Sequence, residues 1–154
     1  MDAGFAGDLV VLCRVGARLC GVPVEHVAET MRPLPVEPVA GMPSFVRGLS
    51  VIRGAPVPVV DAAALLCEGA PEGLPGRYVT LAFGGRHVAL AVDEVHGIRR
   101  LASLRDLPPL FAGAGNDAIE AMGTLDGDLL LVLQGTRLIP ESAWAALEAG
   151  GAAG

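Results

Sequence analysis

Short apolar stretches alternate with glycine- and proline-containing turns along most of the chain. Runs rich in Val, Leu and Ile, with the length and composition typical of β-strands, occupy residues 8–15, 18–22, 55–60, 78–83 and 86–92. A further strand is expected at residues 28–32, after a helical turn that begins with a proline. The pattern therefore predicts a mainly all-β protein.

The order of elements in the first half of the chain recurs in the second. Residues 22–27 align with 90–95, and, at a different offset, Ile-Arg-Gly at 52–54 aligns with Leu-Asp-Gly at 125–127. Two copies of about 70 residues, with about five strands each, favour two small barrels over a solenoid array. Because each copy would be only marginally stable alone, the two should share an apolar seam. We therefore expect two five-stranded β-barrel subdomains related by internal duplication, with short helices and a C-terminal helix.

The same pattern predicts the domain organisation. The barrel domain is expected to span residues 8–140, with 8–67 as the first barrel half and 78–140 as the second. An exchange of terminal strands between the barrels is left open. The sequence EGAPEGLPGR at 68–77 is the clearest linker. Residues 141–154 form a helix and tail, with a tryptophan and a leucine on one side of the helix.

The stretch from residue 46 to 66 combines a β-rich run with the start of a helix. Asp61 follows the run directly and is a good N-cap for residues 62–66. Pro56 and Pro58 are two residues apart, so their missing N–H groups fall on one edge of the strand. This favours a strand at a barrel mouth or a sheet edge over a central strand. The proline-rich segment at 33–44 is expected to run as an extended surface loop.

Charge and cysteine content narrow the possible functions. Hydrophobic residues make up 52% of the chain, and the net charge of −6 at pH 7 argues against a surface for nucleic acid or anionic membranes. The N-terminus lacks the basic and apolar regions of a signal peptide, so a cytoplasmic protein is expected. Cys13, Cys20 and Cys67 form no C-x-x-C motif and are expected to be buried hydrophobes. A bridge between Cys13 and Cys20, which flank a hairpin turn, is not predicted.

A search for catalytic chemistry gives no candidate site. The three histidines His26, His87 and His96 do not have metal-ligand spacing, and no phosphate-binding loop or nucleophile-elbow motif is present. We therefore expect no metal, no cofactor and no catalytic residue.

Glu29 and Arg53 are the two polar residues that need explanation. Glu29 has Val27 and Met31 two residues to either side, so an extended strand would place all three on one face. Arg53 lies among apolar neighbours, where a half-buried cation needs an anionic partner. Bidentate pairing would satisfy both groups. The alternative is two surface charges without contact.

Several segments carry a family resemblance. They are VPVEHVAET at 22–30, PSFVRGLSVIRG at 43–54, PVVDAAALL at 58–66, LAVDEVHGI at 90–98 and MGTLDGDLLLVLQGTRLI at 122–139. In order and spacing they resemble the CheW-type domain, the coupling protein of bacterial chemosensory arrays, over about residues 8–140. Ser50 stands where the family commonly has Asn, and Gln134 where it often has Asp.

The resemblance implies a fold of two five-stranded β-barrels and a non-catalytic adaptor. Such an adaptor couples the cytoplasmic tip of a methyl-accepting chemoreceptor to the regulatory domain of the CheA histidine kinase, in the cytoplasm at membrane-associated receptor arrays. It implies no cofactor, no nucleic acid and no membrane insertion. Alternatives are a scaffold in a non-flagellar chemosensory pathway, for pili or a second messenger, and a small double-barrel ligand-binding protein.

The resemblance also implies two binding surfaces. A receptor-binding groove between the barrels is expected to involve Val27, Glu29, Gly48, Arg53, Gly54, Val95 and Ile98. Kinase contacts are expected around residues 31–39, at Met31, Leu34, Val36 and Val39.

Overall fold

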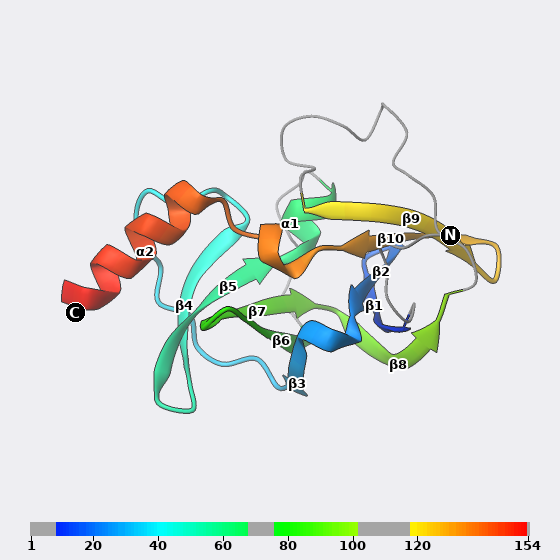
Figure 1. Cartoon of the computed structure of the whole chain (residues 1–154), viewed down its shortest axis with the longest axis horizontal. Helices are drawn as coiled ribbons and strands as arrows, with labels where there is room; N and C mark the ends of the chain where they lie inside the picture. Colours follow the sequence, from blue (N-terminus) through cyan, green and yellow to red (C-terminus); the bar gives the residue numbers. More distant parts are fainter. Residues whose placement is uncertain (1–8, 68–75, 102–117, 154) are drawn as a thin grey trace.

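The computed structural model of the chain describes residues 9–67, 76–101 and 118–153 and contains two five-stranded sheets (Figure 1). Sheet A has the order β8-β1-β2-β10-β9, and sheet B the order β3-β6-β7-β5-β4. The strands of sheet A are β1 (Leu9–Val15), β2 (Arg18–Pro23), β8 (Glu94–Arg100), β9 (Ile119–Leu125) and β10 (Asp128–Leu133). Those of sheet B are β3 (Val27–Met31), β4 (Val46–Ile52), β5 (Ala55–Asp61), β6 (Arg77–Phe83) and β7 (Arg86–Val92). The predicted mainly all-β fold with two five-stranded units is confirmed.

Each sheet combines strands from both halves of the chain. Sheet A joins β1 and β2 to β8, β9 and β10, whereas sheet B joins β3, β4 and β5 to β6 and β7. The short 3-10 turn η2 (Val24–His26) connects the two sheets at the first crossing. Most of the predicted linker, residues 68–75, lies outside the described residues, and Arg77 already begins β6.

The strand pairing confirms the internal duplication. Val11 pairs with Val22 in the β1–β2 hairpin, as Val79 pairs with Leu90 in the β6–β7 hairpin. Each hairpin then adds a parallel strand, β10 beside β2 and β5 beside β7. Two tight turns also agree: Arg53 and Gly54 have φ of 53° and 83°, and Asp126 and Gly127 have φ of 52° and 87°. Both turns have the two positive φ values that two-residue hairpins prefer.

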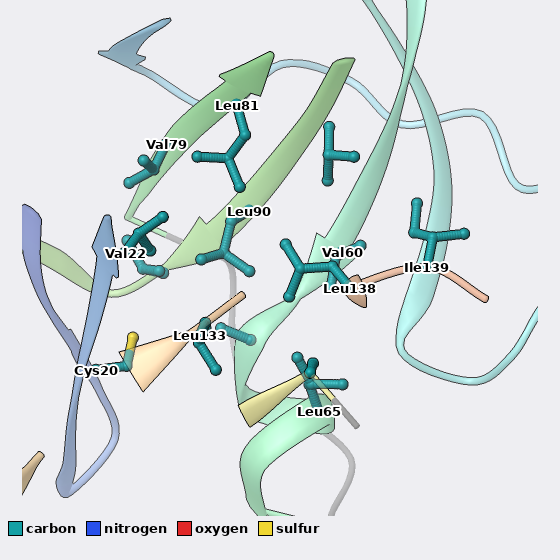
Figure 2. Packing of buried hydrophobic residues seen from close by; sticks show 14 of the residues in the cluster. Cys20, Val22, Val60, Leu65, Val79, Leu81, Leu90, Leu133, Leu138 and Ile139 are labelled. Atoms are coloured by element: carbon teal, nitrogen blue, oxygen red, sulfur yellow. The ribbon is translucent and has the colours of Figure 1, made fainter. Parts of the chain in front are cut away.

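Three apolar clusters form the interior, and the largest is shared by both sheets (Figure 2). This shared cluster includes Cys20, Val22 and Leu133 of sheet A together with Val60, Val79, Leu81 and Leu90 of sheet B. Each sheet also has a smaller cluster of its own, built around Val10 and Leu12 in sheet A and around Tyr78 and Val59 in sheet B. Successive residues of one strand therefore face different clusters, and both faces are buried. This explains why the strands read as continuous apolar runs.

The two prolines of β5 lie in a strand that is not at the edge of its sheet. β5 lies between β7 and β4, so the sheet-edge alternative was wrong. Pro56 and Pro58 pair with β4, but the parallel pairing with β7 covers only Val59 to Asp61. The prolines thus precede the part of β5 that pairs with β7, where the missing N–H groups break no ladder.

Helix α1 (Ala62–Cys67) begins at the predicted cap. The Asp61 carboxylate accepts hydrogen bonds from the backbone N–H groups of Ala63, at 2.9 Å, and Ala64, at 3.3 Å. Asp61 is buried and also accepts a hydrogen bond from Arg47 Nε at 2.7 Å. The cap is therefore confirmed, and the partner cation that a buried carboxylate requires comes from β4.

The C-terminal helix α2 (Glu141–Ala153) packs against the β6–β7 hairpin. Trp144 and Leu147 are buried in the shared cluster, as the sequence predicts for one side of the helix. Arg86, at the start of β7, stacks over the Trp144 ring at 4.6 Å and binds the carboxylates of Glu141 and Glu148. Its hydrogen bond lowers the pKa of Glu141. One arginine thus fixes the helix by stacking and by charge.

Candidate functional site

Glu29 and Arg53 form a bidentate ion pair, which we call the clasp. Arg53 Nε donates to Glu29 Oε2 and Arg53 Nη2 donates to Glu29 Oε1, both at 2.8 Å. These hydrogen bonds lower the pKa of Glu29 and raise that of Arg53. Glu29 lies on β3 and Arg53 in the β4–β5 turn, at opposite edges of sheet B in hydrogen-bond order. Because these two side chains are in contact, sheet B must curve so that its two edges approach each other. The clasp joins these two edges.

The environment of the clasp differs from the expectation. The Arg53 side chain is 76% exposed and that of Glu29 is 31% exposed, so the guanidinium is not half-buried. The left-handed conformation of Arg53 at the tip of the hairpin holds the side chain away from the apolar interior. Because the pair is exposed, it contributes little to the free energy of unfolding. Its role is to hold β3 and the β4–β5 turn in a fixed relative orientation.

The expected common face of Val27, Glu29 and Met31 is interrupted by a β-bulge. Val27 pairs with Leu81 and Glu29 with the next residue, Thr80, which leaves Ala28 unpaired. Val27 consequently packs on the shared cluster, whereas Met31 packs on the cluster of sheet B. The prediction that Glu29 shares the face of Val27 was wrong, because a bulge shifts the side-chain alternation by one residue.

An equivalent bulge lies on β8, an edge strand of sheet A. Val95 pairs with Cys13 and Gly97 with Leu12, which leaves His96 unpaired. Val27 and Val95 both pack on the shared cluster. Thr30 follows Glu29 on β3, and Ile98 follows Gly97 on β8. Their pairing partners, Val79 and Val11, belong to the shared cluster. We call the set of Val27, Thr30, Val95 and Ile98 the seam surface.

The seam surface keeps three of the predicted groove residues and adds one. Both of its strands are edge strands, and Figure 1 shows them along the lower side of the molecule. Ile98 is 60% exposed and is one of three exposed large hydrophobic residues among those that the structure describes. Thr30 was not predicted, because period-two alternation without the bulge assigns it to the opposite face. The sequence feature that indicates Thr30 as a site residue is its alignment with Ile98 in the duplicated sequence.

The two predicted groove glycines have different environments. Gly54 is exposed in the β4–β5 turn. Gly48 is buried and has φ of 144°, and a Cβ atom there would lie 2.1 Å from the carbonyl oxygen of Glu37. Gly48 therefore permits a close approach between β4 and the segment that precedes it.

Residues 32–45, which connect β3 to β4, are fixed to sheet B by polar contacts. Glu37 and Leu49 exchange two backbone hydrogen bonds, at 2.7 and 2.9 Å. The Tyr78 hydroxyl donates to the carbonyl oxygen of Leu34 at 3.0 Å, and the Ser50 hydroxyl donates to that of Pro35 at 2.9 Å. Because both hydroxyl groups lie in buried residues, the loop carbonyls replace the water they would otherwise bind.

This anchored loop presents an apolar area that we call the loop surface: Leu34, Val36, Leu49 and Val51. All four line a depression of about 310 Å³ together with Pro35 and Glu37. Val51 is 66% exposed, the largest value among the exposed large hydrophobic residues described. Leu49 and Val51 were not predicted, although the alternating burial of β4 places both on its outer side.

Met31 and Val39, the other two predicted kinase-contact residues, are half-buried. Met31 packs on the cluster of sheet B and Val39 on the shared cluster. Leu34 and Val36 also pack on the cluster of sheet B, and Leu49 packs on the shared cluster. Met31 and Val39 differ from these residues in that they do not line the depression.

A second depression, of about 440 Å³, contains none of the predicted site residues. It lies where α1, the 3-10 turn η4 (Gly135–Arg137) and the start of α2 meet, and its apolar lining includes Phe45, Leu65, Ala118 and Ile139. Within the described ranges no cluster of three or more His, Cys, Asp or Glu side chains is arranged to hold a metal ion. Among the helices described, none has the length and apolarity needed to cross a membrane.

Sequence comparisons with known proteins find one family over most of the chain. The family model described as CheW-like domain matches residues 9–143. Protein FrzA of Myxococcus xanthus is 35% identical over 101 residues, which cover 65% of this chain and 63% of FrzA. Chemotaxis protein CheW of Klebsiella aerogenes is 25% identical over 130 residues, or 82% of this chain and 78% of that protein.

A solved structure supports the fold. The crystal structure of the scaffolding protein TtCheW from Thermoanaerobacter tengcongensis superposes with a TM-score of 0.70 at 20% identity. The superposition covers 82% of this chain and 88% of that chain.

Proposed function

The chain belongs to the CheW-like domain family, and from that premise we propose that it is a non-catalytic adaptor in chemotaxis-type signalling. It couples the cytoplasmic tip of a chemoreceptor to the regulatory domain of a CheA-type histidine kinase. The observation that carries the proposal is the presence of two separate exposed apolar surfaces on one small domain. An adaptor that bridges two partners requires two such surfaces.

The seam surface is the proposed receptor site. A receptor tip is helical, and an amphipathic helix binds by burying apolar side chains spaced along one face. Ile98 and Val95 supply apolar contacts from sheet A, and Val27 supplies one from sheet B. Glu29 of the clasp lies on β3 beside Thr30, so its ion pair with Arg53 holds β3 and with it one side of the site.

The loop surface is the proposed kinase site. Its residues project from β4 and from the segment held by Tyr78 and Ser50, so the apolar area is ordered before a partner arrives. Ordering the surface in advance lowers the entropy lost on binding. Val51 is the most exposed residue of this surface, so its burial against a partner should contribute most to the binding free energy.

The two assignments are tested by isothermal titration of the purified chain with a receptor cytoplasmic fragment and, separately, with a CheA regulatory domain. Ile98→Glu should weaken receptor binding about tenfold or more and leave kinase binding unchanged. Val51→Glu should have the opposite selectivity. Leu129→Glu is the matched control, because Leu129 is also an exposed large hydrophobic residue but belongs to neither surface. Equal losses for both partners in either variant would contradict the assignment of separate sites.

The clasp gives a second test. Arg53→Glu places two carboxylates together and should weaken receptor binding about tenfold while kinase binding changes little. Asp126→Arg is the matched control, since Asp126 has the same left-handed conformation in the equivalent turn of sheet A. The double variant Glu29→Arg with Arg53→Glu restores the pair in reverse and should recover most of the affinity. Failure of this variant to recover would show that Arg53 acts through a direct contact and not by positioning β3.

A further inference from the structure

Cys13 and Cys20 lie directly opposite each other in the β1–β2 hairpin. Both are fully buried and both belong to the shared cluster, into which Figure 2 shows the Cys20 side chain pointing. Directly opposite residues of antiparallel strands have Cα atoms about 4.5–5.5 Å apart, which is within the range of about 4.4–6.8 Å that disulfides span. The equivalent pair in the other hairpin, Leu81 and Val88, is aliphatic.

The cysteine pair lies next to the seam surface. Cys13 pairs with Cys20 on one side and with Val95 of β8 on the other. The pairing between β1 and β8 shifts register at this point, so β8 is held less regularly here than along an unbroken ladder. A movement of β1 toward β2 would therefore be transmitted first to β8.

We propose that Cys13 and Cys20 are a redox-sensitive pair that closes to a cross-strand disulfide and thereby loosens β8. Each thiol loses one proton and one electron as the S–S bond forms. A peroxide accepts the two protons and two electrons, its O–O bond breaks, and with hydrogen peroxide two waters are released. A thiol reductant reverses the reaction.

The geometry explains why closure affects β8. Opposite Cβ atoms in a sheet are about 4.5–5.5 Å apart, whereas a disulfide holds them about 3.8 Å apart. Closure therefore draws β1 toward β2 and away from Val95. A disulfide under such strain is more easily reduced than a structural one, which suits a reversible device. The oxidised form should also bind a receptor with lower affinity through the seam surface, and this consequence rests on the proposed function.

Peptide mapping tests the cross-link directly. Arg14 and Arg18 separate the two cysteines, and trypsin does not cleave between Arg32 and Pro33. It therefore releases Cys13 in residues 1–14 and Cys20 in residues 19–47, while Cys67 falls in residues 54–77. After hydrogen peroxide treatment and blocking of the remaining thiols, we expect peptide 1–14 to be joined to peptide 19–47, and dithiothreitol should separate the two. Cys67→Ala should retain this product and Cys20→Ala should lose it. Separate blocked peptides, or a link that includes Cys67 instead, would overturn the proposal.

Hydrogen exchange tests the effect on β8 without any partner. The amides of residues 94–100 should exchange about fivefold or more faster in the oxidised chain than in the reduced one, while those of β5 remain unchanged. Peroxide-treated Cys20→Ala is the control for unrelated oxidation. Unchanged exchange in β8 of the cross-linked chain would overturn the switch. Neither measurement uses a receptor or a kinase. A failure of the disulfide proposal is therefore distinguishable from a failure of the proposed adaptor function.

Discussion

Sheets A and B share one pairing scheme but differ in the polar contacts that hold their open sides. In sheet B the clasp joins Glu29 to Arg53. The aligned positions in sheet A are Gly97 and Asp126, which cannot form that pair. The hairpin turns nevertheless have the same backbone conformation. The duplicated backbone has thus been kept while the charged contact exists in one copy only.

The hydroxyl contacts show the same difference. Tyr78 and Ser50 fix the loop of sheet B, and the aligned residues of sheet A are Val10 and Gly123, neither of which has a hydroxyl group. Strand pairing needs only apolar side chains on both faces and suitable turns. Specific polar contacts are needed where a loop must be held in one position. The comparison teaches that the fold is common to both copies, whereas the two hydroxyl groups that hold the loop of sheet B have no counterpart at the aligned positions of sheet A.

The largest expected effect is at the close approach of the loop to β4. Gly48→Ala introduces a Cβ atom 2.1 Å from the Glu37 carbonyl oxygen at a positive φ. We expect a loss of about 3–5 kcal/mol in the free energy of unfolding. Gly97→Ala in sheet A is the matched control, because φ there is 101° but nothing lies within 4 Å. It should cost about 1–2 kcal/mol. Urea denaturation measures both, and equal losses would contradict the importance of the loop contact.

An intermediate effect is expected from the hydroxyl contacts. Tyr78→Phe removes the donor to the Leu34 carbonyl oxygen and should lower the free energy of unfolding by about 1–2 kcal/mol. It should also weaken kinase binding, because the loop surface is then less ordered, and leave receptor binding unchanged. Ser50→Ala tests the neighbouring contact to Pro35 in the same way. Full kinase affinity in both variants would show that the loop surface does not depend on these contacts.

The smallest effect concerns the pH dependence of the clasp. The hydrogen bond from Arg53 lowers the pKa of Glu29 below its ordinary value of 4.5 in the folded chain. Its contribution to stability is therefore present above that value and is lost as the pH falls through the lowered pKa. Wild type should unfold about 1–2 °C higher than Glu29→Gln at pH 7, and this difference should shrink as the pH is lowered below 4.5. Glu141 titrates identically in both proteins, so it cancels from the difference.

Much of the fold follows from sequence because its determinants are local or repeated. The Asp61 cap, the buried side of α2 and the equivalence of the two hairpin turns each depend on a few neighbouring residues. The sequence predicts the duplication because apolar strands and turns recur in the same order in its two halves.

The site was less predictable because its arrangement depends on contacts distant in sequence. The bulge at Ala28 depends on the pairing of β3 with β6, and the bulge at His96 on the pairing of β8 with β1. Neither residue type indicates a bulge by itself. The exposure of Arg53 follows from the turn conformation and not from its apolar neighbours. Val51 belongs to a surface only because residues 32–45 lie beside β4.

The central claim is that one copy of this chain holds a receptor and a kinase together. It is tested most directly by immobilising a receptor cytoplasmic fragment and measuring capture of a CheA regulatory domain with and without the chain. We expect capture only when the chain is present. Ile98→Glu should prevent retention of the chain itself, whereas Val51→Glu should leave the chain bound to receptor without the kinase. Failure of wild type to bring the two partners together, although it binds each one separately, would contradict the adaptor function.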